Sequence, residues 1–261
     1  MKNFGVFTPG GAVKNANGEA LKGYMMKLTK INGEYEIWLP EHRANRPEWN
    51  IKNGGWEKER LASMKERIQH RNSPVVYYIG NEEGDMSALC QMWGASMVLV
   101  EPNEKVWPNT KAIWEANKLT PPLGCFVGFA ANADIFPSSH MNYNRFPACA
   151  DGPIISDHGF KELHDRGDIP QVKIDTLVQM VGIVPDFLSI DVEGSEFEVL
   201  RGAEKTLREH RPIIWLSVHP EFMFANWKEY SGDLRQWVKD LGYKEEILAY
   251  SHELHLRYAP I

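Results

Sequence analysis

Short apolar runs alternate with helical segments throughout residues 74–261, which we treat as one domain. Strands are expected at Val75–Ile79, Met97–Val100, Cys125–Phe129, Phe187–Ile190, Ile213–Val218, Tyr243–Ala249 and Glu253–Tyr258. Helices are expected at Asp85–Trp93, Val106–Asn117, Thr176–Val181, Phe197–Glu209 and Gly232–Leu241. Alternation of strand and helix is typical of βαβ units, so the pattern predicts an α/β fold with a mostly parallel sheet and helices on both faces.

Residues 1–73 follow a different pattern, which predicts an accessory subdomain. Alternating residues over Tyr24–Ile31 and Glu34–Leu39 flank the dipeptide Asn32-Gly33. This arrangement predicts a β-hairpin, because Asn-Gly accepts the positive φ angles of a tight turn. A helix is expected over Glu57–Ile68, which completes this hairpin-and-helix unit.

The periodic pattern stops between Asn132 and Gln171, where the sequence is polar and contains several prolines. A loop of this length within a compact domain is commonly a lid or a binding segment. We interpret residues 132–171 as a loop insertion that borders the site and is the internal stretch most open to proteolysis. Its histidines, His140 and His158, are reserve candidates for proton transfer.

Composition and charge narrow the class of protein. The 261 residues are 43% hydrophobic and 25% charged, as in ordinary globular proteins, which disfavours a disordered chain. No apolar run approaches the roughly 20 residues of a membrane span, and the first residues lack the apolar centre of a signal peptide, so we expect a cytoplasmic protein. The net charge of −6 argues against a nucleic-acid partner, because phosphate binding needs clustered Lys and Arg. The three cysteines have no CxxC spacing, so neither a disulfide framework nor a zinc knuckle is indicated.

Polar residues follow four of the predicted strands. In an open parallel sheet, ligands bind beyond the carboxyl ends of the strands, where the strand order reverses. The four polar segments are Gly80–Gly84, Glu101–Asn103, Asp191–Gly194 and His219–Glu221. We therefore expect the functional site to be built from these segments.

The first two segments indicate a ligand that contains a nucleoside. Gly80 and Gly84 allow the backbone to pass close to a ligand, and the acids between them suit the cationic groups of S-adenosylmethionine better than a pyrophosphate. Glu101 follows the second strand about twenty positions later, where a carboxylate can accept hydrogen bonds from both ribose hydroxyls. An NAD-dependent oxidoreductase would use the same carboxylate, although the GxGxxG turn is missing. A third interpretation makes Glu101 a structural acid at a strand end.

The segment after the fourth predicted strand carries the most specific motif. Ser189–Ala203 reads SIDVEGSEFEVLRGA. It resembles the FkbM family of methyltransferases, in which a strand ends in an IDVEG-type motif before a helix of the form E-x-E-V-L-x-G-A. The resemblance extends to YIGNEEG at Tyr78–Gly84, in place of the family's D-x-G-A-N-x-G, and to VEPN at Val100–Asn103. It covers roughly Val75–Ala249 and leaves the N-terminal subdomain outside.

Two departures from the family's cofactor turn change the contacts expected there. Tyr78 stands where the family has an acid, and Asn81-Glu82 replaces Ala-Asn. We expect Glu82 or Glu83 to supply the missing negative charge to the ammonium group of the cofactor. The atypical turn also leaves open a non-catalytic module that binds S-adenosylmethionine or another nucleoside.

The resemblance implies a Rossmann-like class I methyltransferase fold with a mostly parallel, seven-stranded sheet. It implies an S-adenosylmethionine-dependent O-methyltransferase that acts on a hydroxyl of a small-molecule or carbohydrate acceptor, sugar-like or a natural product. The residues that we expect to bind the cofactor are Tyr78, Gly80, Asn81, Glu82, Gly84, Glu101, Pro102, Asn103, Ala131 and Asp191. The sequence identifies neither the acceptor nor the oligomeric state.

Carboxylates and a histidine at the later strand ends are the candidates for proton transfer. Asp191 is the first candidate for the base, His219 is the second, and Glu193 is expected to shape the pocket. Asp191, Glu193, His219 and Glu221 could instead hold magnesium or manganese, although we favour a metal-free site. The stretch His252-Glu253-Leu254-His255 is not interpreted as a zinc motif, because strand-like alternation places its histidines on opposite faces.

Overall fold

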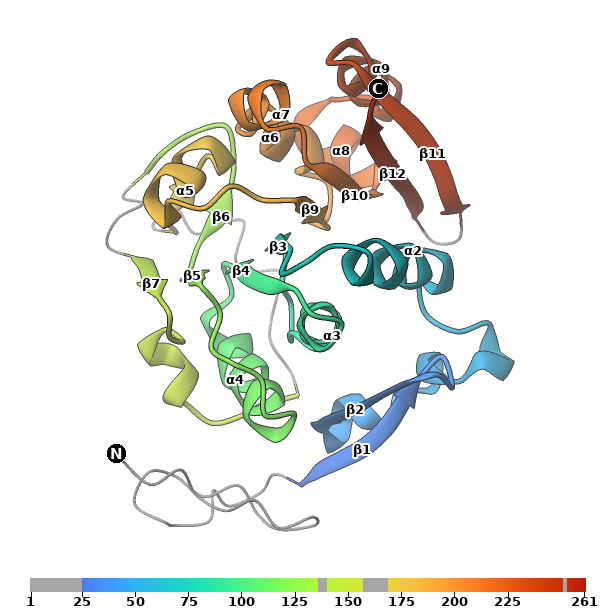
Figure 1. Cartoon of the computed structure of the whole chain (residues 1–261), viewed down its shortest axis with the longest axis vertical. Coiled ribbons are helices and arrows are strands. Elements are labelled where there is room, and N and C mark those ends of the chain that lie inside the picture. Colours follow the sequence, from blue (N-terminus) through green and yellow to red (C-terminus); the bar gives the residue numbers. More distant parts are fainter. Residues whose placement is uncertain (1–24, 136–139, 157–168, 251–252) are drawn as a thin grey trace.

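The computed structural model describes residues 25–135, 140–156, 169–250 and 253–261 of the chain. Its centre is an eight-stranded sheet in the order β11-β12-β10-β9-β3-β4-β5-β7 (Figure 1). The strands are β3 (Val75–Ile79), β4 (Ser96–Val100), β5 (Gly124–Phe126), β7 (Met141–Tyr143), β9 (Phe187–Ile190), β10 (Ile213–Val218), β11 (Tyr243–Tyr250) and β12 (Leu254–Pro260). Tyr24, His158 and His252 lie outside the described residues, as do residues 136–139 and 157–168 of the expected loop.

All seven expected strands form, and they are doubly wound around β3. Neighbours from β5 to β10 pair in parallel, whereas β12 runs antiparallel to both β10 and β11. The chain builds outward from β3 through β4 to β5, and then crosses back to β9 on the other side of β3. The strand order therefore reverses between β3 and β9, which is where this architecture binds ligands.

The eighth strand corrects the expected number of strands. β7 pairs antiparallel with β5, with Met141 opposite Phe126 and Tyr143 opposite Gly124. It lies within residues 132–171, which we expected to be a loop. A three-residue strand in polar sequence is too short for an alternating pattern, and the free edge of β5 decides its conformation. The lid role of the remaining segment stays a prediction.

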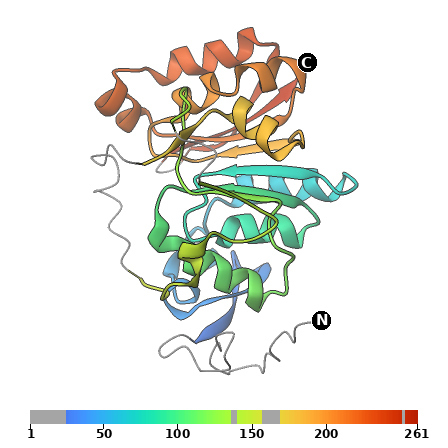
Figure 2. The same cartoon turned by 90° about the vertical axis from the view of Figure 1, so that its left-hand side faces the viewer.

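Helices cover both faces of the sheet, as expected, and Figure 2 shows the two helical layers. One face carries α2 (Lys58–Gln69), α3 (Asp85–Met92) and α4 (Trp107–Ala116). The other face carries α5 (Ile174–Val181), α6 (Glu196–Arg201), α7 (Glu204–Glu209) and α9 (Ser231–Asp240). Alternation along each strand feeds the two cores: in β3, Tyr78 packs with the first group of helices and Tyr77 with the second.

The N-terminal hairpin forms with β1 (Met26–Ile31) and β2 (Tyr35–Pro40). Asn32 and Gly33 take positive φ angles of 56° and 72°, as the dipeptide predicted, although the connection has three residues because Ile31 pairs with Tyr35. The hairpin lies at the opposite end of the molecule from β11 and β12 (Figure 1). A four-residue helix, α1 (Glu41–Ala44), and two 3-10 turns, η1 (Pro47–Trp49) and η2 (Ile51–Asn53), connect it to α2.

Two helical segments differ from the expectation. The single helix expected over Phe197–Glu209 is divided into α6 and α7 at Gly202, where a Cβ atom would lie 2.1 Å from the carbonyl oxygen of Ala131. An unexpected helix, α8 (Pro220–Trp227), follows β10 directly. Short strands β6 (Phe129–Ala130) and β8 (Gln171–Val172) pair in parallel beside the main sheet. Among the described residues, no helix is long and apolar enough to cross a membrane.

Candidate active site

The ends of β3 and β9 meet at the point where the strand order reverses. Asp191 donates its backbone N–H to the carbonyl oxygen of Ile79 at 3.0 Å. Gly80 has a φ of 82°, and a Cβ atom there would lie 1.7 Å from the carbonyl oxygen of Asp191. Only glycine fits this approach, because the conformation is left-handed and the neighbour is backbone. The first cofactor segment and the IDVEG-type segment are therefore in direct contact.

The turn between β3 and α3 is held by its own side chains. Gly84 precedes α3 with a φ of 90°. The buried Asn81 donates from Nδ2 to Thr110 Oγ1 at 3.0 Å and accepts from Ser87 Oγ. Asn81 thus fixes the shape of the turn from inside.

Glu101 connects the turn to the end of β4. It is 4% exposed, Oε2 accepts from the Glu82 N–H at 2.8 Å, and Oε1 accepts from the Asn103 N–H at 2.9 Å. Burial raises the pKa of Glu101 to about 8, against the opposing effect of the two backbone hydrogen bonds. Each carboxylate oxygen can accept a further hydrogen bond, so this carboxyl group fits a diol such as that of ribose. The next residues continue into a 3-10 turn, η3 (Glu104–Val106), which Asn103 caps through Oδ1.

Glu82 and Glu83, the two acids expected to contact the ammonium group of the cofactor, differ in their environment. Glu83 has a side chain that is 5% exposed, and its Oε2 lies 2.7 Å from both His42 Nε2 and Asn109 Nδ2. The side chain of Glu82 is 51% exposed. Of the two alternatives, Glu82 is therefore the carboxylate that can reach a ligand.

Two of the expected cofactor residues lie in packed positions. Tyr78 is 3% exposed and belongs to the hydrophobic core beneath α2 and α3, so its side chain does not replace the family's acid. Ala131 donates its N–H to the carbonyl oxygen of Val172, and its own carbonyl oxygen lies against Gly202. These contacts tie Ala131 to β8 and to the junction of α6 and α7, and its role in cofactor binding stays a prediction.

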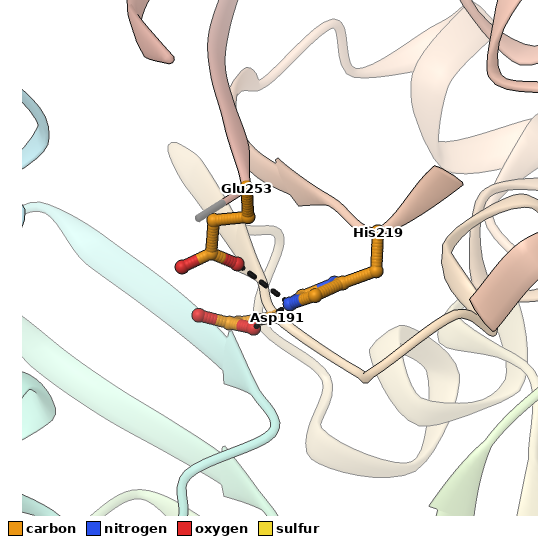
Figure 3. A group of neighbouring side chains, drawn as sticks. All are labelled: Asp191, His219 and Glu253. Carbon is orange, nitrogen blue, oxygen red and sulfur yellow. Dashed lines mark ion pairs between the residues drawn. The ribbon is translucent and has the colours of Figure 1, made fainter. Parts of the chain in front are cut away.

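Asp191, His219 and Glu253 come together at the carboxyl ends of β9 and β10 (Figure 3). His219 Nε2 lies 2.6 Å from Glu253 Oε2 and 3.8 Å from Asp191 Oδ1. His219 Nδ1 lies 2.7 Å from Oε1 of the buried Glu196. The imidazole is therefore held between two carboxylates, and Asp191 lies beside it.

The protonation of His219 follows from these contacts. Burial lowers its pKa, but the hydrogen bonds to Glu196 and Glu253 outweigh burial and raise the pKa to about 11. For Glu253, burial raises the pKa, but the hydrogen bond with His219 outweighs it and lowers the pKa to about 2. His219 is an imidazolium at neutral pH and donates both of its N–H groups. This arrangement disfavours the expected role of His219 as second base, since an imidazolium has no lone pair to accept a proton.

Arg60 of α2 reaches the same strand ends from the face of the sheet that carries α2, α3 and α4. Its fully buried guanidinium donates from Nη1 to Asp191 Oδ2 at 3.0 Å and from Nη2 to Ser189 Oγ at 2.9 Å. Nη1 also donates to Glu57 Oε2 at 2.5 Å. Burial raises the pKa of Glu57 to about 7, although the charge of Arg60 opposes this effect. Asp191 is thus fixed through Oδ2, and its side chain remains 23% exposed.

The residues that could hold a divalent ion differ from the expected set. Asp191, His219 and Glu253 each offer a ligand atom, and these atoms lie within 4.8 Å of one another. Glu193 Oε2 is 3.6 Å from His219 Nε2 but its side chain is 66% exposed, whereas Glu221 is an exposed residue in the first turn of α8. A metal would require His219 to lose a proton that Glu196 and Glu253 stabilise.

Sequence reasoning missed Glu253, Glu196, Arg60 and Glu57. Glu253 was set aside with its neighbouring histidines, yet β12 pairs with β10 so that Leu254 lies opposite Val218, which places Glu253 next to His219. Knowing the pairing of the last strand would have revealed it. Glu196 lies in the matched motif itself, where an acid shortly after the glycine was a visible signal.

An exposed aromatic surface borders the strand ends. Phe222 and Trp227 of α8 are 47% and 50% exposed. The Phe222 ring is stacked beside His219 at 5.9 Å, and Trp227 Nε1 donates to Ser195 Oγ at 3.3 Å. Phe224 and Tyr230 continue the surface, with ring centroids 5.4 Å apart. Aromatic side chains exposed beside a polar site are typical of ligand or partner contacts.

Comparison with protein families gives one match relevant to this site. Residues 75–245, more than half of the chain, match the methyltransferase FkbM domain. This span contains the turn at Gly80, the Glu101 strand end, and the segment from Asp191 to His219. Arg60, Glu57 and Glu253 lie outside it. No curated protein matches the sequence significantly.

Solved structures match with low sequence identity. A SAM-dependent methyltransferase from Agrobacterium tumefaciens is 11% identical with a TM-score of 0.50, and the match covers 93% of this chain and 72% of that one. An FkbM methyltransferase from Methylobacillus flagellatus KT is 16% identical with a TM-score of 0.45, covering 71% of this chain and 43% of that one. This chain thus spans less than half the length of that relative. A T. thermophilus 16S rRNA N2 G1207 methyltransferase, solved with AdoMet and guanosine, is 11% identical with a TM-score of 0.45, covering 93% and 52%.

Proposed function

Because the chain belongs to the FkbM family of methyltransferases, we propose that it transfers the methyl group of S-adenosylmethionine to a hydroxyl of a small, sugar-like or natural-product acceptor. The enzyme is an S-adenosylmethionine-dependent methyltransferase, and the NAD-dependent oxidoreductase is set aside. The observation that carries the proposal is the position of Asp191. Its backbone contacts the glycine turn at Gly80, and its partly exposed carboxylate lies beside His219, whose ring stacks with Phe222 of α8.

Two carboxylates divide the recognition of the cofactor in this proposal. The buried Glu101 accepts hydrogen bonds from the ribose hydroxyls, and the exposed Glu82 faces the ammonium group. Gly80 leaves the backbone free of a side chain at the closest approach of the two strand ends. When bound, S-adenosylmethionine supplies a methyl group activated by the positive sulfur.

Asp191 takes the proton in the proposed reaction. Asp191 would accept the proton of the acceptor hydroxyl as that oxygen takes the methyl group from the sulfonium. Arg60 fixes the carboxylate through Oδ2, so that Oδ1 is the oxygen left to meet the acceptor hydroxyl. The imidazolium of His219 keeps Glu253 and Glu196 in place and adds a positive charge 3.8 Å from Oδ1. A metal-free reaction is consistent with these charges.

The chemistry around Asp191 supports a neutral acceptor that carries hydroxyl groups. The exposed rings of Phe222 and Trp227 can stack on the apolar face of a sugar or another ring. The exposed carboxylate of Glu193 can accept hydrogen bonds from hydroxyl groups, and it would repel a phosphate. The T. thermophilus neighbour acts on ribosomal RNA, so an RNA acceptor is the comparison that an experiment must include.

Transfer of a labelled methyl group tests the proposal directly. The protein is incubated with S-adenosylmethionine carrying a deuterated methyl group, and with panels of glycosides, hydroxylated natural products and RNA oligonucleotides. Mass spectrometry then detects the product. We expect transfer to an oxygen of a hydroxylated small molecule. Binding of S-adenosylhomocysteine with no transfer to any panel would favour the non-catalytic module, and transfer to RNA alone would refute the acceptor class.

The role of Asp191 is tested by Asp191→Asn, which keeps the shape of the side chain but cannot take the proton. We expect kcat to fall by about 100-fold or more, with S-adenosylhomocysteine affinity changed less than threefold. Glu209→Gln is the control, since it removes an exposed carboxylate at the end of α7. Thermal unfolding of both variants checks that the fold persists. Unchanged kcat in Asp191→Asn would move proton transfer to another group.

A further inference from the structure

We propose that Arg43, which lies outside the matched family domain, is a positioning residue for the cofactor turn, and that it sets the affinity of the enzyme for S-adenosylmethionine. The proposal rests on the proposed function of the turn at Gly80–Gly84. It assigns a role in cofactor binding to the N-terminal unit, whose sequence shows no resemblance to the family. The argument depends on the acids of this particular turn and on the cation that meets them.

Arg43 of α1 is 5% exposed and directs its guanidinium at three carboxylates beside the turn. Nε donates to Asp85 Oδ2 at 2.9 Å, and Nη2 donates to the same oxygen. Nη1 lies 3.4 Å from Glu83 Oε1, and Nη2 lies 3.5 Å from Glu82 Oε2. One planar side chain therefore spans the turn from Glu82 to the first residue of α3.

Trp49 holds Arg43 in place. Trp49 Nε1 donates to the carbonyl oxygen of Arg43 at 2.5 Å, and the Trp49 ring lies 5.6 Å from the guanidinium carbon. His42, the preceding residue, contacts Glu83 Oε2 at 2.7 Å. Preorganised groups lose less conformational entropy when they bind a partner. The segment thus presents an ordered cationic surface to the turn.

The charges of the turn explain why a cation is needed there. Glu82, Glu83 and Asp85 place three carboxylates within four residues, and Glu83 and Asp85 are buried. Buried like charges repel one another strongly when no opposite charge is present. In the usual family turn, D-x-G-A-N-x-G, an asparagine stands at the position of Glu82, and the position of Glu83 varies. Arg43 is therefore matched to the departures that distinguish this chain's turn.

A hydrogen bond links the arginine to the expected ribose site. The backbone N–H of Glu82, which has a φ of 49°, donates to Glu101 Oε2 at 2.8 Å. If the turn relaxes, this N–H moves and Glu101 loses its orientation. The cofactor then binds more weakly, whereas Asp191 and His219, which Arg43 does not contact in the described structure, keep their arrangement. The expected signature is a higher KM for S-adenosylmethionine at nearly constant kcat.

Arg43→Met in the full chain tests the proposal, with Arg46→Met as the matched control. Arg46 lies in the same connecting segment and over the same Trp49 ring, at 5.2 Å, but its ion pair is with Glu48, and its charge acts on Glu82 less than that of Arg43 does. We expect Arg43→Met to weaken S-adenosylhomocysteine binding at least tenfold in calorimetry, and Arg46→Met to change it less than twofold. The triple variant Arg43→Met/Glu83→Gln/Asp85→Asn should recover part of the loss, because it removes the repulsion.

Hydrogen exchange separates failure of this inference from failure of the proposed function. Without any ligand, backbone exchange of residues 81–85 should rise in Arg43→Met and stay unchanged in Arg46→Met. If the wild type shows no binding of S-adenosylhomocysteine, the proposed function fails. The exchange result still tests whether Arg43 orders the turn. Binding and exchange both equal to wild type in Arg43→Met would overturn the inference. Should Arg43→Met fail to fold, Arg43→Lys keeps the charge without the planar fork and must show the same changes in smaller measure.

Discussion

Because His219 carries a positive charge in the folded protein, we expect the free energy of unfolding to depend on pH. Its folded pKa of about 11 lies above the ordinary value near 6.5, so its stabilising effect is complete below about pH 6.5 and is lost as the pH rises toward 11. One group contributes at most about 1.4 kcal/mol per pH unit. We expect the free energy of unfolding of the wild type to fall more steeply than that of His219→Asn between pH 7 and 10, measured by urea titration. Parallel curves would mean that His219 is neutral in the folded protein.

We expect Glu101 to release a proton when the cofactor binds. With a pKa of about 8, it is mostly protonated at pH 7 in the free protein. Ribose hydroxyls that donate to the carboxylate favour its ionised form, so binding should release close to one proton. Calorimetry in two buffers of different ionisation enthalpy measures this number. Glu101→Gln should abolish the release and weaken binding at least tenfold, whereas the exposed neighbour Glu104→Gln should change neither.

At the scale of elements, sequence reasoning succeeded where the pattern was long and failed where pairing decided the structure. The central strands were predicted because each alternates between two cores, as Tyr77 and Tyr78 do in β3. β7 was missed because the edge of β5 defines it. The break at Gly202 was missed because the backbone that packs against this residue, at Ala131, is distant in the sequence. Helix α8 has one deeply buried residue, Met223, so it lacks a buried stripe that a helical period would reveal.

The residues of the candidate site also fall into those that the sequence predicted and those that it missed. Gly80, Glu101, Asp191 and His219 were found because strand ends of a parallel sheet converge, which topology alone requires. The partners that decide their chemistry come from other elements. Arg60 arrives from α2, and Glu253 precedes an antiparallel strand. Their positions depend on tertiary packing, so the sequence predicted a histidine base without the two carboxylates that hold its imidazole.

At the scale of the whole molecule, the N-terminal unit shares one core with the sheet. Leu61 and Met64 of α2 are fully buried in the same apolar cluster as Val76 of β3 and Trp215 of β10. Trp215 Nε1 also donates to Ser63 Oγ at 3.1 Å. The face of the sheet beneath α2 would therefore be exposed in a chain that begins at residue 74. The division at residue 73 stays a proposal about sequence organisation, and the core makes a separate prediction about folding.

We expect a fragment of residues 74–261 to lack cooperative unfolding, because three kinds of contact are lost together. The apolar side chains of α2 leave the core, and each buried leucine or methionine is worth about 1.5–3 kcal/mol. Asp191 loses the guanidinium of Arg60, and the acidic turn loses Arg43. Such losses are comparable to the roughly 5–15 kcal/mol by which a typical domain is stable. Calorimetric scanning of the fragment beside the full chain measures the outcome, and a fragment beginning at residue 25 is the control, since it keeps every described contact. A sharp transition in the 74–261 fragment, within a few degrees of the full chain, would show that the α/β domain folds without its N-terminal unit.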